Sequence, residues 1–135
     1  MDNALVRAED LTCGYGEDPV LRGISLDLHP GDFVGVIGPN GCGKSTLIRA
    51  LTGILSLHAG KVSLQGKGLP TLSRREVARQ VAVIPQDTML LFGFSVLEMV
   101  LMGRSPHLKR FQRAGRRDLD LALEALRQTD LIEQR

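Results

Sequence analysis

Nine residues, from Gly38 to Thr46, constrain the fold of this chain more than any other stretch. Their sequence, GPNGCGKST, fits the pattern G-x-x-x-x-G-K-[ST], in which a glycine-rich loop surrounds phosphate groups. The loop follows an apolar, β-branched run at 33–37 and precedes apolar residues at helical spacing that end at Gly53. We therefore predict a buried parallel strand, a phosphate-binding loop and a helix, in that order. The alternative is a glycine-rich turn before an ordinary helix.

Each residue type in the loop has a chemical task. Glycines permit positive φ angles and a close approach of the backbone to an anion, and the loop has them at positions 38, 41 and 43. The helix that we expect to begin near Lys44 adds unpaired N–H groups and the positive end of its dipole. Lys44 supplies a cation for the β- and γ-phosphates, Ser45 a hydroxyl for Mg²⁺, and Thr46 a donor to the next phosphate.

The composition is that of an ordinary globular domain. The chain has 135 residues, 43% of them hydrophobic and 24% charged, and its net charge of +2 does not by itself imply a nucleic-acid partner. Its first residues carry charges where a signal peptide needs an apolar segment, and no apolar run reaches membrane-spanning length. The two cysteines lack metal-ligand spacing. We expect a soluble, cytoplasmic protein of one domain.

Before the loop, the sequence predicts two strands, at 4–11 and 20–28, with an irregularity at Gly23. Between these strands, Tyr15 stands between two glycines, so its ring has no bulky neighbours and can lie flat against a base. On this pattern alone, a tyrosine packed on the surface of a turn is the better interpretation.

After the loop, we expect a short strand at 60–65, and a buried strand at 81–84 that delivers Gln86 to a strand end. Two short helices should each begin with a capping box, at Ser73–Glu76 and at Ser95–Glu98. A last, amphipathic helix is predicted over 119–128.

Two other stretches each allow two interpretations. The apolar residues at 89–94 form either an exposed docking patch or side chains packed under their own helix. The basic stretch at 104–117 is either a solvated linker, which we favour, or a nucleic-acid patch.

Tyr15, the loop at 38–46 and the sequence VIPQ at 83–86, in this order, resemble the ATP-binding subunit of ABC transporters. The resemblance covers essentially the whole chain. It implies an α/β fold of the P-loop NTPase class, ABC ATPase type, with an N-terminal antiparallel β portion. Residues 1–86 would form the β portion and the P-loop core, and residues 87–135 the Q-loop and the start of a helical subdomain.

The same resemblance implies ligands and roles. With ATP and Mg²⁺ as cofactors, Tyr15 would stack on adenine, and Ser45 and Gln86 would contact Mg²⁺. Gln86 would also help to position attacking water, which makes Lys44 and Gln86 the catalytic candidates. The nucleotide-binding candidates are Tyr15, Gly38, Pro39, Asn40, Gly41, Cys42, Gly43, Lys44, Ser45 and Thr46.

The resemblance also implies partners. The stretch at 95–107 is similar to that of importers of iron–siderophore complexes, haem or cobalamin, and does not choose among the three. A membrane permease would bind near 87–94, so that the protein is peripheral on the inner face of the cell membrane. The parent protein would be a homodimer of ATPase subunits, and no nucleic-acid partner is expected.

Several motifs of the family would lie beyond residue 135: the signature serine-glycine-glycine loop, the strand with its aspartate and catalytic glutamate, and the switch histidine. His107 belongs to a different stretch and is no substitute. Without the glutamate there is no obvious general base, so we expect the chain to be incomplete for catalysis. Without the aspartate strand, we expect an exposed sheet edge and a chain that is marginally stable or associates.

Three other hypotheses remain open. The chain could bind nucleotide without hydrolysing it, as a regulator or a fragment. Mg²⁺-dependent phosphate release that vanishes in Lys44→Ala would instead support an enzyme. It could belong to a non-transport ABC protein that binds DNA or RNA through 104–117, which requires salt-sensitive binding. It could be another P-loop kinase or GTPase, but Tyr15 and Gln86 would then have no role.

Overall fold

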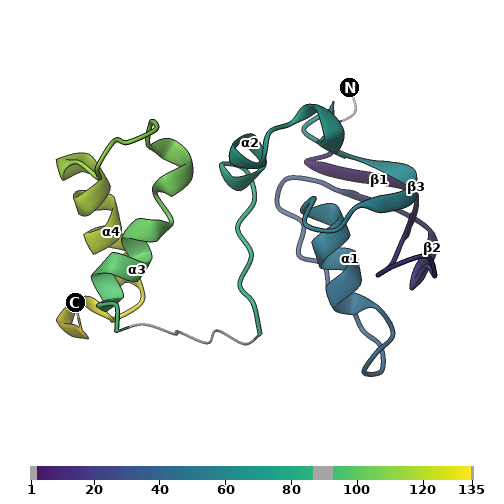
Figure 1. Ribbon diagram of the computed structural model, residues 1–135. Coiled ribbons are helices and arrows are strands. Elements are labelled where there is room, and N and C mark those ends of the chain that lie inside the picture. The colour runs from purple at the N-terminus through teal and green to yellow at the C-terminus, as the bar shows by residue number, and fades with distance from the viewer. Residues whose placement is uncertain (1–2, 87–92, 135) are drawn as a thin grey trace. The chain divides into compact units, whose positions relative to one another are not determined.

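The fold is described from a computed structural model over residues 3–86 and 93–134. The chain divides into two compact units, the first ending at Val81 and the second beginning at Ala82 (Figure 1). Among the described residues, no helix is both long enough and apolar enough to cross a membrane.

The first unit is built on an antiparallel sheet with the strand order β2-β1-β3-β4 (Figure 1). The strands are β1 (Val6–Cys13), β2 (Leu21–Leu28), β3 (Leu57–Leu64) and β4 (Lys67–Gly68). The register between β1 and β2 shifts on either side of Leu11, which pairs with Ile24. The neighbouring Gly23 has a φ of 62°, so the irregularity that the sequence predicts there is confirmed.

One helix, α1 (Lys44–Leu51), packs on this sheet (Figure 1). It begins at the residue that the loop motif predicts, and the chain leaves it through Gly53 at a φ of 70°, as expected for a C-terminal stop. The buried core consists of small and aliphatic side chains: Ala8, Leu11, Cys13, Ala50 and Val62. Burial raises the pKa of the Cys13 thiol, which keeps it in the neutral, unreactive form.

The remaining helices are one longer helix, in the second unit, and several short ones. The first unit also contains the 3-10 helix η1 (Leu69–Thr71) and α2 (Arg74–Ala78). The second unit contains α3 (Val96–Met102), η2 (Ser105–His107), α4 (Arg116–Gln128) and η3 (Ile132–Gln134). Both predicted capping boxes are present, at the starts of α2 and α3. Helix α3 packs on α4, whose Ala122 and Leu126 are buried.

Two apolar runs that we predicted as buried strands, the first of them parallel, are not strands. Within 3–86, neither 33–37 nor 81–84 forms strand hydrogen bonds, and Phe33, Ile37 and Ile84 have exposed fractions of 101%, 96% and 96%. Branched apolar side chains favour an extended, buried backbone, but a strand also needs a neighbour for its N–H and C=O groups. The described sheet is antiparallel throughout and pairs with neither run.

Candidate functional site

Residues 38–43 of the motif form a compact turn that leads into α1, and residues 44–46 are the first residues of that helix. The amide of Cys42 donates to the carbonyl oxygen of Pro39 at 3.4 Å, which closes the turn. Gly41 and Gly43 have φ angles of 81° and 100°, in the left-handed region that favours glycine. The backbone of the loop therefore takes a course that residues with side chains rarely follow.

Gly38 corrects one prediction, because its φ is not positive. Its missing side chain instead permits close packing within the loop: a Cβ atom at this position would lie 2.7 Å from Sγ of Cys42. Gly43 meets both demands, since a Cβ there would lie 2.7 Å from Cδ2 of Leu21 at the start of β2. The glycines of the motif are thus required for different physical reasons: a positive φ at Gly41, close packing at Gly38, and both at Gly43.

The side chain of Lys44 folds back over the loop that precedes it. Its ammonium donates to the carbonyl oxygens of Gly38 at 2.8 Å and Pro39 at 2.7 Å. Charge-assisted hydrogen bonds to an anion are stronger than those to a neutral carbonyl. A phosphate group in the loop would therefore find the cation already in place and would offer it a better acceptor.

The start of α1 is suited to an anion. Its N-cap residue is Gly43, no side chain caps it, and its first turn carries no acidic residue. The first N–H groups of a helix lack intrahelical partners and carry the positive end of the dipole. The loop, the ammonium and the helix end thus concentrate donors and positive charge in one place.

The two hydroxyl residues of this turn differ in exposure. Ser45 is exposed and therefore open to a metal ion, whereas Thr46 is 5% exposed, so its role as a phosphate donor stays a prediction. Among residues 3–86 and 93–134, no three His, Cys, Asp or Glu side chains form a group that could hold a metal. Mg²⁺ commonly takes one or two protein oxygens together with phosphate oxygens and water, and Ser45 beside a phosphate fits that chemistry.

Tyr15 lies in the loop between β1 and β2, and the two ends of this loop approach Gly43 of the motif and Arg49 of α1. Its ring is 54% exposed, and its hydroxyl oxygen accepts a hydrogen bond of 2.6 Å from Nη1 of Arg49 on α1. Val20, at the end of the same loop, and Leu21, at the start of β2, lie close to Gly43. Sequence reasoning did not find Arg49, and nothing in the motif points to it, because it contacts a residue 34 positions away.

The other predicted site residues belong to the second unit or to the undescribed segment. Gln86 is exposed and lies in the second unit, so its place beside Mg²⁺ stays a prediction. Of the expected permease-binding stretch at 87–94, residues 87–92 lie outside the described residues. In the basic stretch at 104–117, Arg104 bonds the carboxylate of Asp118 at 2.9 Å, which shows a structural task for one of its cations.

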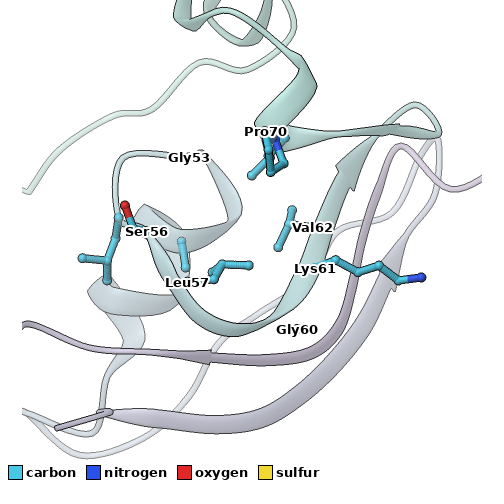
Figure 2. Close-up of a pocket in the computed structure, with 10 residues that line it drawn as sticks. Gly53, Ser56, Leu57, Gly60, Lys61, Val62 and Pro70 are labelled. Carbon is cyan, nitrogen blue, oxygen red and sulfur yellow. The ribbon is translucent and has the colours of Figure 1, made fainter. Parts of the chain in front are cut away.

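Apart from the phosphate loop, the first unit has a hollow of about 480 Å³ between the end of α1, β3 and η1 (Figure 2). Most of its lining is apolar, and Lys61 is the charged residue among its described lining residues. Figure 2 shows the Lys61 side chain extending away from the hollow, and its ammonium pairs with Glu9 at 3.0 Å. This hollow therefore lacks the converging polar groups that a nucleotide needs.

Comparisons with known proteins agree with this geometry. A family model described as "ABC transporter" matches residues 21–135. The hemin import ATP-binding protein HmuV of Pseudomonas fluorescens (strain Pf0-1) is 45% identical over 127 residues, which are 93% of this chain and 48% of the relative. The iron(3+)-hydroxamate import ATP-binding protein FhuC of Bacillus subtilis (strain 168) is 35% identical over 125 residues, 93% of this chain and 46% of the relative.

Solved structures of ABC transporter proteins also match this chain. The structure of an ATP-binding cassette of an ABC transporter is 29% identical with a TM-score of 0.77, and the match covers 98% of this chain and 56% of that one. The chain spans about half the length of the curated relatives that it matches.

Proposed function

Because the chain belongs to the ABC transporter family, we propose that it is the part of an importer's ATP-binding subunit that holds Mg²⁺-ATP. Its fold is of the ABC ATPase type. The observation that carries the proposal is the position of Lys44, whose ammonium lies 2.7 Å and 2.8 Å from two carbonyl oxygens of the phosphate loop, at the uncapped start of α1. A cation, a glycine loop and a helix N-terminus together form a site for the phosphates of a nucleotide.

Each part of the nucleotide has a residue to meet it. Lys44 and the loop would hold the β- and γ-phosphates, the Ser45 hydroxyl would be a ligand for Mg²⁺, and the Tyr15 ring would stack on adenine. The exposure of Ser45 and of the Tyr15 ring supports these roles. Gln86 would be a further contact of Mg²⁺ and would help to position the attacking water. When bound, Mg²⁺ neutralises developing phosphate charge, and this chain's residues bind and orient the nucleotide.

The wider role follows from the relatives. Two of them carry hemin import and iron(3+)-hydroxamate import in their names, so we assign this chain to an importer of haem or an iron–siderophore. ATP hydrolysis by two such subunits would drive uptake through a membrane permease that binds near 87–94. The protein would then lie on the inner face of the cell membrane.

A competition series tests the nucleotide site. A fluorescent ATP analogue bound to the chain is displaced with ATP, ADP and AMP, each with Mg²⁺ and with EDTA. We expect displacement to weaken from ATP to AMP, because AMP cannot fill the phosphate loop, and we expect EDTA to weaken ATP alone or most. Equal displacement by ATP and AMP would contradict the proposal. Mg²⁺-dependent phosphate release, lost in Lys44→Ala, would add hydrolysis, whereas binding without release would leave this chain as a nucleotide-binding part.

A further inference from the structure

We propose that Arg49 is a positioning residue for Tyr15: its guanidinium holds the ring by its hydroxyl, so that one face of the ring stays available for adenine. The proposal deepens the nucleotide site and rests on the proposed function, in which Tyr15 stacks on the base. It assigns a role to a residue outside the loop motif.

The two side chains meet through a short hydrogen bond to the hydroxyl and a long cation–π contact with the ring. Nη1 of Arg49 donates to the Tyr15 hydroxyl oxygen at 2.6 Å, and the guanidinium carbon lies 5.9 Å from the ring centroid. A group stacked flat on the ring would have its atoms about 3.5–4.0 Å from the ring atoms. The guanidinium therefore fixes the ring at its hydroxyl without occupying the distance at which a base would stack.

The backbone of Arg49 is itself fixed. Its carbonyl oxygen accepts hydrogen bonds from the amides of Ile54 at 2.9 Å and Leu55 at 3.0 Å, in the turn that ends α1. Its side chain is exposed, so it contributes little to the core. The guanidinium thus extends from an ordered helix end, and its loss should not disturb the packing of the first unit.

The tyrosine is carried by a tightly closed loop. The amide of Val20 donates to the carbonyl oxygen of Cys13 at 2.9 Å, and Cys13 is fully buried. A Cβ atom on Gly14 would lie 2.8 Å from the backbone nitrogen of Val20, which shows how closely the two strands of the loop approach. The loop fixes the backbone of Tyr15, and the exposed ring then needs a partner such as Arg49 to fix its direction.

Helix α1 carries both the residue proposed for the phosphates, Lys44, and the residue proposed to orient Tyr15, Arg49. Lys44 begins this helix and Arg49 is five residues further on, a rise of about 7.5 Å along the axis. The same helix therefore places the cation for the phosphates and the donor that orients the base-stacking ring. This arrangement predicts that Arg49 affects recognition of the base and leaves recognition of the phosphates unchanged.

Two ligands separate these effects. ATP carries both base and phosphates, whereas inorganic tripolyphosphate carries the phosphates alone. Binding of each, with Mg²⁺, is measured by calorimetry on the whole chain and on four variants: Arg49→Met, Tyr15→Phe, the double variant and Tyr15→Ala. Lys67→Met, on the strand at the far edge of the sheet from β2, is the matched control for the loss of one positive charge.

We expect Arg49→Met and Tyr15→Phe each to weaken ATP binding roughly three- to tenfold, because the lost hydrogen bond orients the ring and does not itself contact ATP. The double variant should bind ATP as each single variant does, because both remove the same bond. Tyr15→Ala should bind ATP most weakly of the four variants. Tripolyphosphate should bind with equal affinity to all four variants and to Lys67→Met. Equal ATP affinity of Arg49→Met and the unchanged chain would overturn the proposal, as would additive losses or a parallel loss of tripolyphosphate.

Failure of the proposed function gives a different result. If the unchanged chain binds neither ATP nor tripolyphosphate, the phosphate site and this proposal both fall. If it binds ATP and the Arg49 variant binds it equally well, the nucleotide site stands and only the role of Arg49 is wrong. Thermal unfolding of Arg49→Met checks that the first unit stays folded.

Discussion

The ammonium nitrogen of Lys44 lies 2.7 Å from the carbonyl oxygen of Pro39, so the phosphate loop holds its own cation. The hydrogen bond places the positive charge over the turn that the glycines shape. A phosphate group would take over a cation that is already near its place, and little rearrangement would be needed to bind it.

Gly43 should be the least replaceable glycine of this loop for stability. Its φ of 100° is unfavourable for alanine, and a Cβ atom would also lie 2.7 Å from Leu21. We expect Gly43→Ala to lower the free energy of unfolding by about 1–3 kcal/mol. The control is Gly16→Ala, where φ is 81° but nothing lies within 4 Å of the added Cβ, so the loss should be smaller. Equal losses in urea unfolding would show that the contact with Leu21 has no effect.

The two cysteines should differ in reactivity, and bound nucleotide should protect one of them. Cys42 is exposed within the loop, whereas Cys13 is buried and burial raises its pKa, so its reactive thiolate is scarce. Iodoacetamide should label Cys42 first, and Mg²⁺-ATP should slow that labelling. Mass spectrometry of the labelled peptides measures both rates. If Mg²⁺-ATP left the rate at Cys42 unchanged while binding saturably, the ligand would lie elsewhere.

The capping box at the start of α3 should stabilise the second unit. The hydroxyl of Ser95 accepts from the amide of Glu98 at 3.3 Å, and the Glu98 carboxylate accepts from the amide of Ser95 at 2.8 Å. We expect Ser95→Ala to cost about 1 kcal/mol and Ser95→Gly only a few tenths, because glycine is tolerated at N-caps. Denaturant unfolding followed by helical circular dichroism measures both. If Ser95→Ala were as stable as Ser95→Gly, the stabilising role of Ser95 as an N-cap would be wrong.

The ion pair between Arg104 and Asp118 should make the stability of the second unit depend on pH. The hydrogen bond from Arg104, and then that from the amide of Gly115, lower the pKa of the Asp118 carboxyl. A carboxylate with a lowered pKa in the folded state adds stability that is complete above its unfolded pKa and is lost as pH falls through its folded pKa.

Arg104→Met should therefore destabilise the chain near neutral pH, and the difference from the unchanged chain should shrink as the pH falls through the acid range. Arg127→Met is the matched control, because Arg127 pairs with Glu124 at 3.2 Å with both side chains more than half exposed. Surface pairs of that kind contribute little. Thermal melts over a pH series measure both, and a constant difference between Arg104→Met and the unchanged chain would contradict the assignment.

Local chemistry allowed much of the fold to be predicted. The loop pattern indicated where α1 begins, Gly53 where it ends, and the two serine-glutamate pairs where α2 and α3 begin. Each of these signals acts through hydrogen bonds or φ angles within a few residues. For the same reason, the irregularity at Gly23 could be read from the sequence.

Features that depend on distant residues could not be predicted. The runs at 33–37 and 81–84 have the composition of buried strands, but the described sheet gives them no neighbour, and composition does not tell which strand will pair. Phe33 and Ile37 are exposed, and it stays a prediction that the chain is marginally stable or associates. The bond from Arg49 to Tyr15 joins residues 34 positions apart and left no local pattern.

If the loop beneath the Lys44 ammonium binds the phosphates of a nucleotide, removal of that ammonium must weaken the binding of ATP. The whole chain, Lys44→Ala and the control Lys61→Ala are titrated with Mg²⁺-ATP by calorimetry; Lys61 is exposed and pairs with Glu9 on the sheet. We expect saturable binding to the unchanged chain and to Lys61→Ala, and at least tenfold weaker binding to Lys44→Ala, because a charged partner of the phosphates is lost. Equal binding by all three chains, or no binding by the unchanged chain, would contradict it.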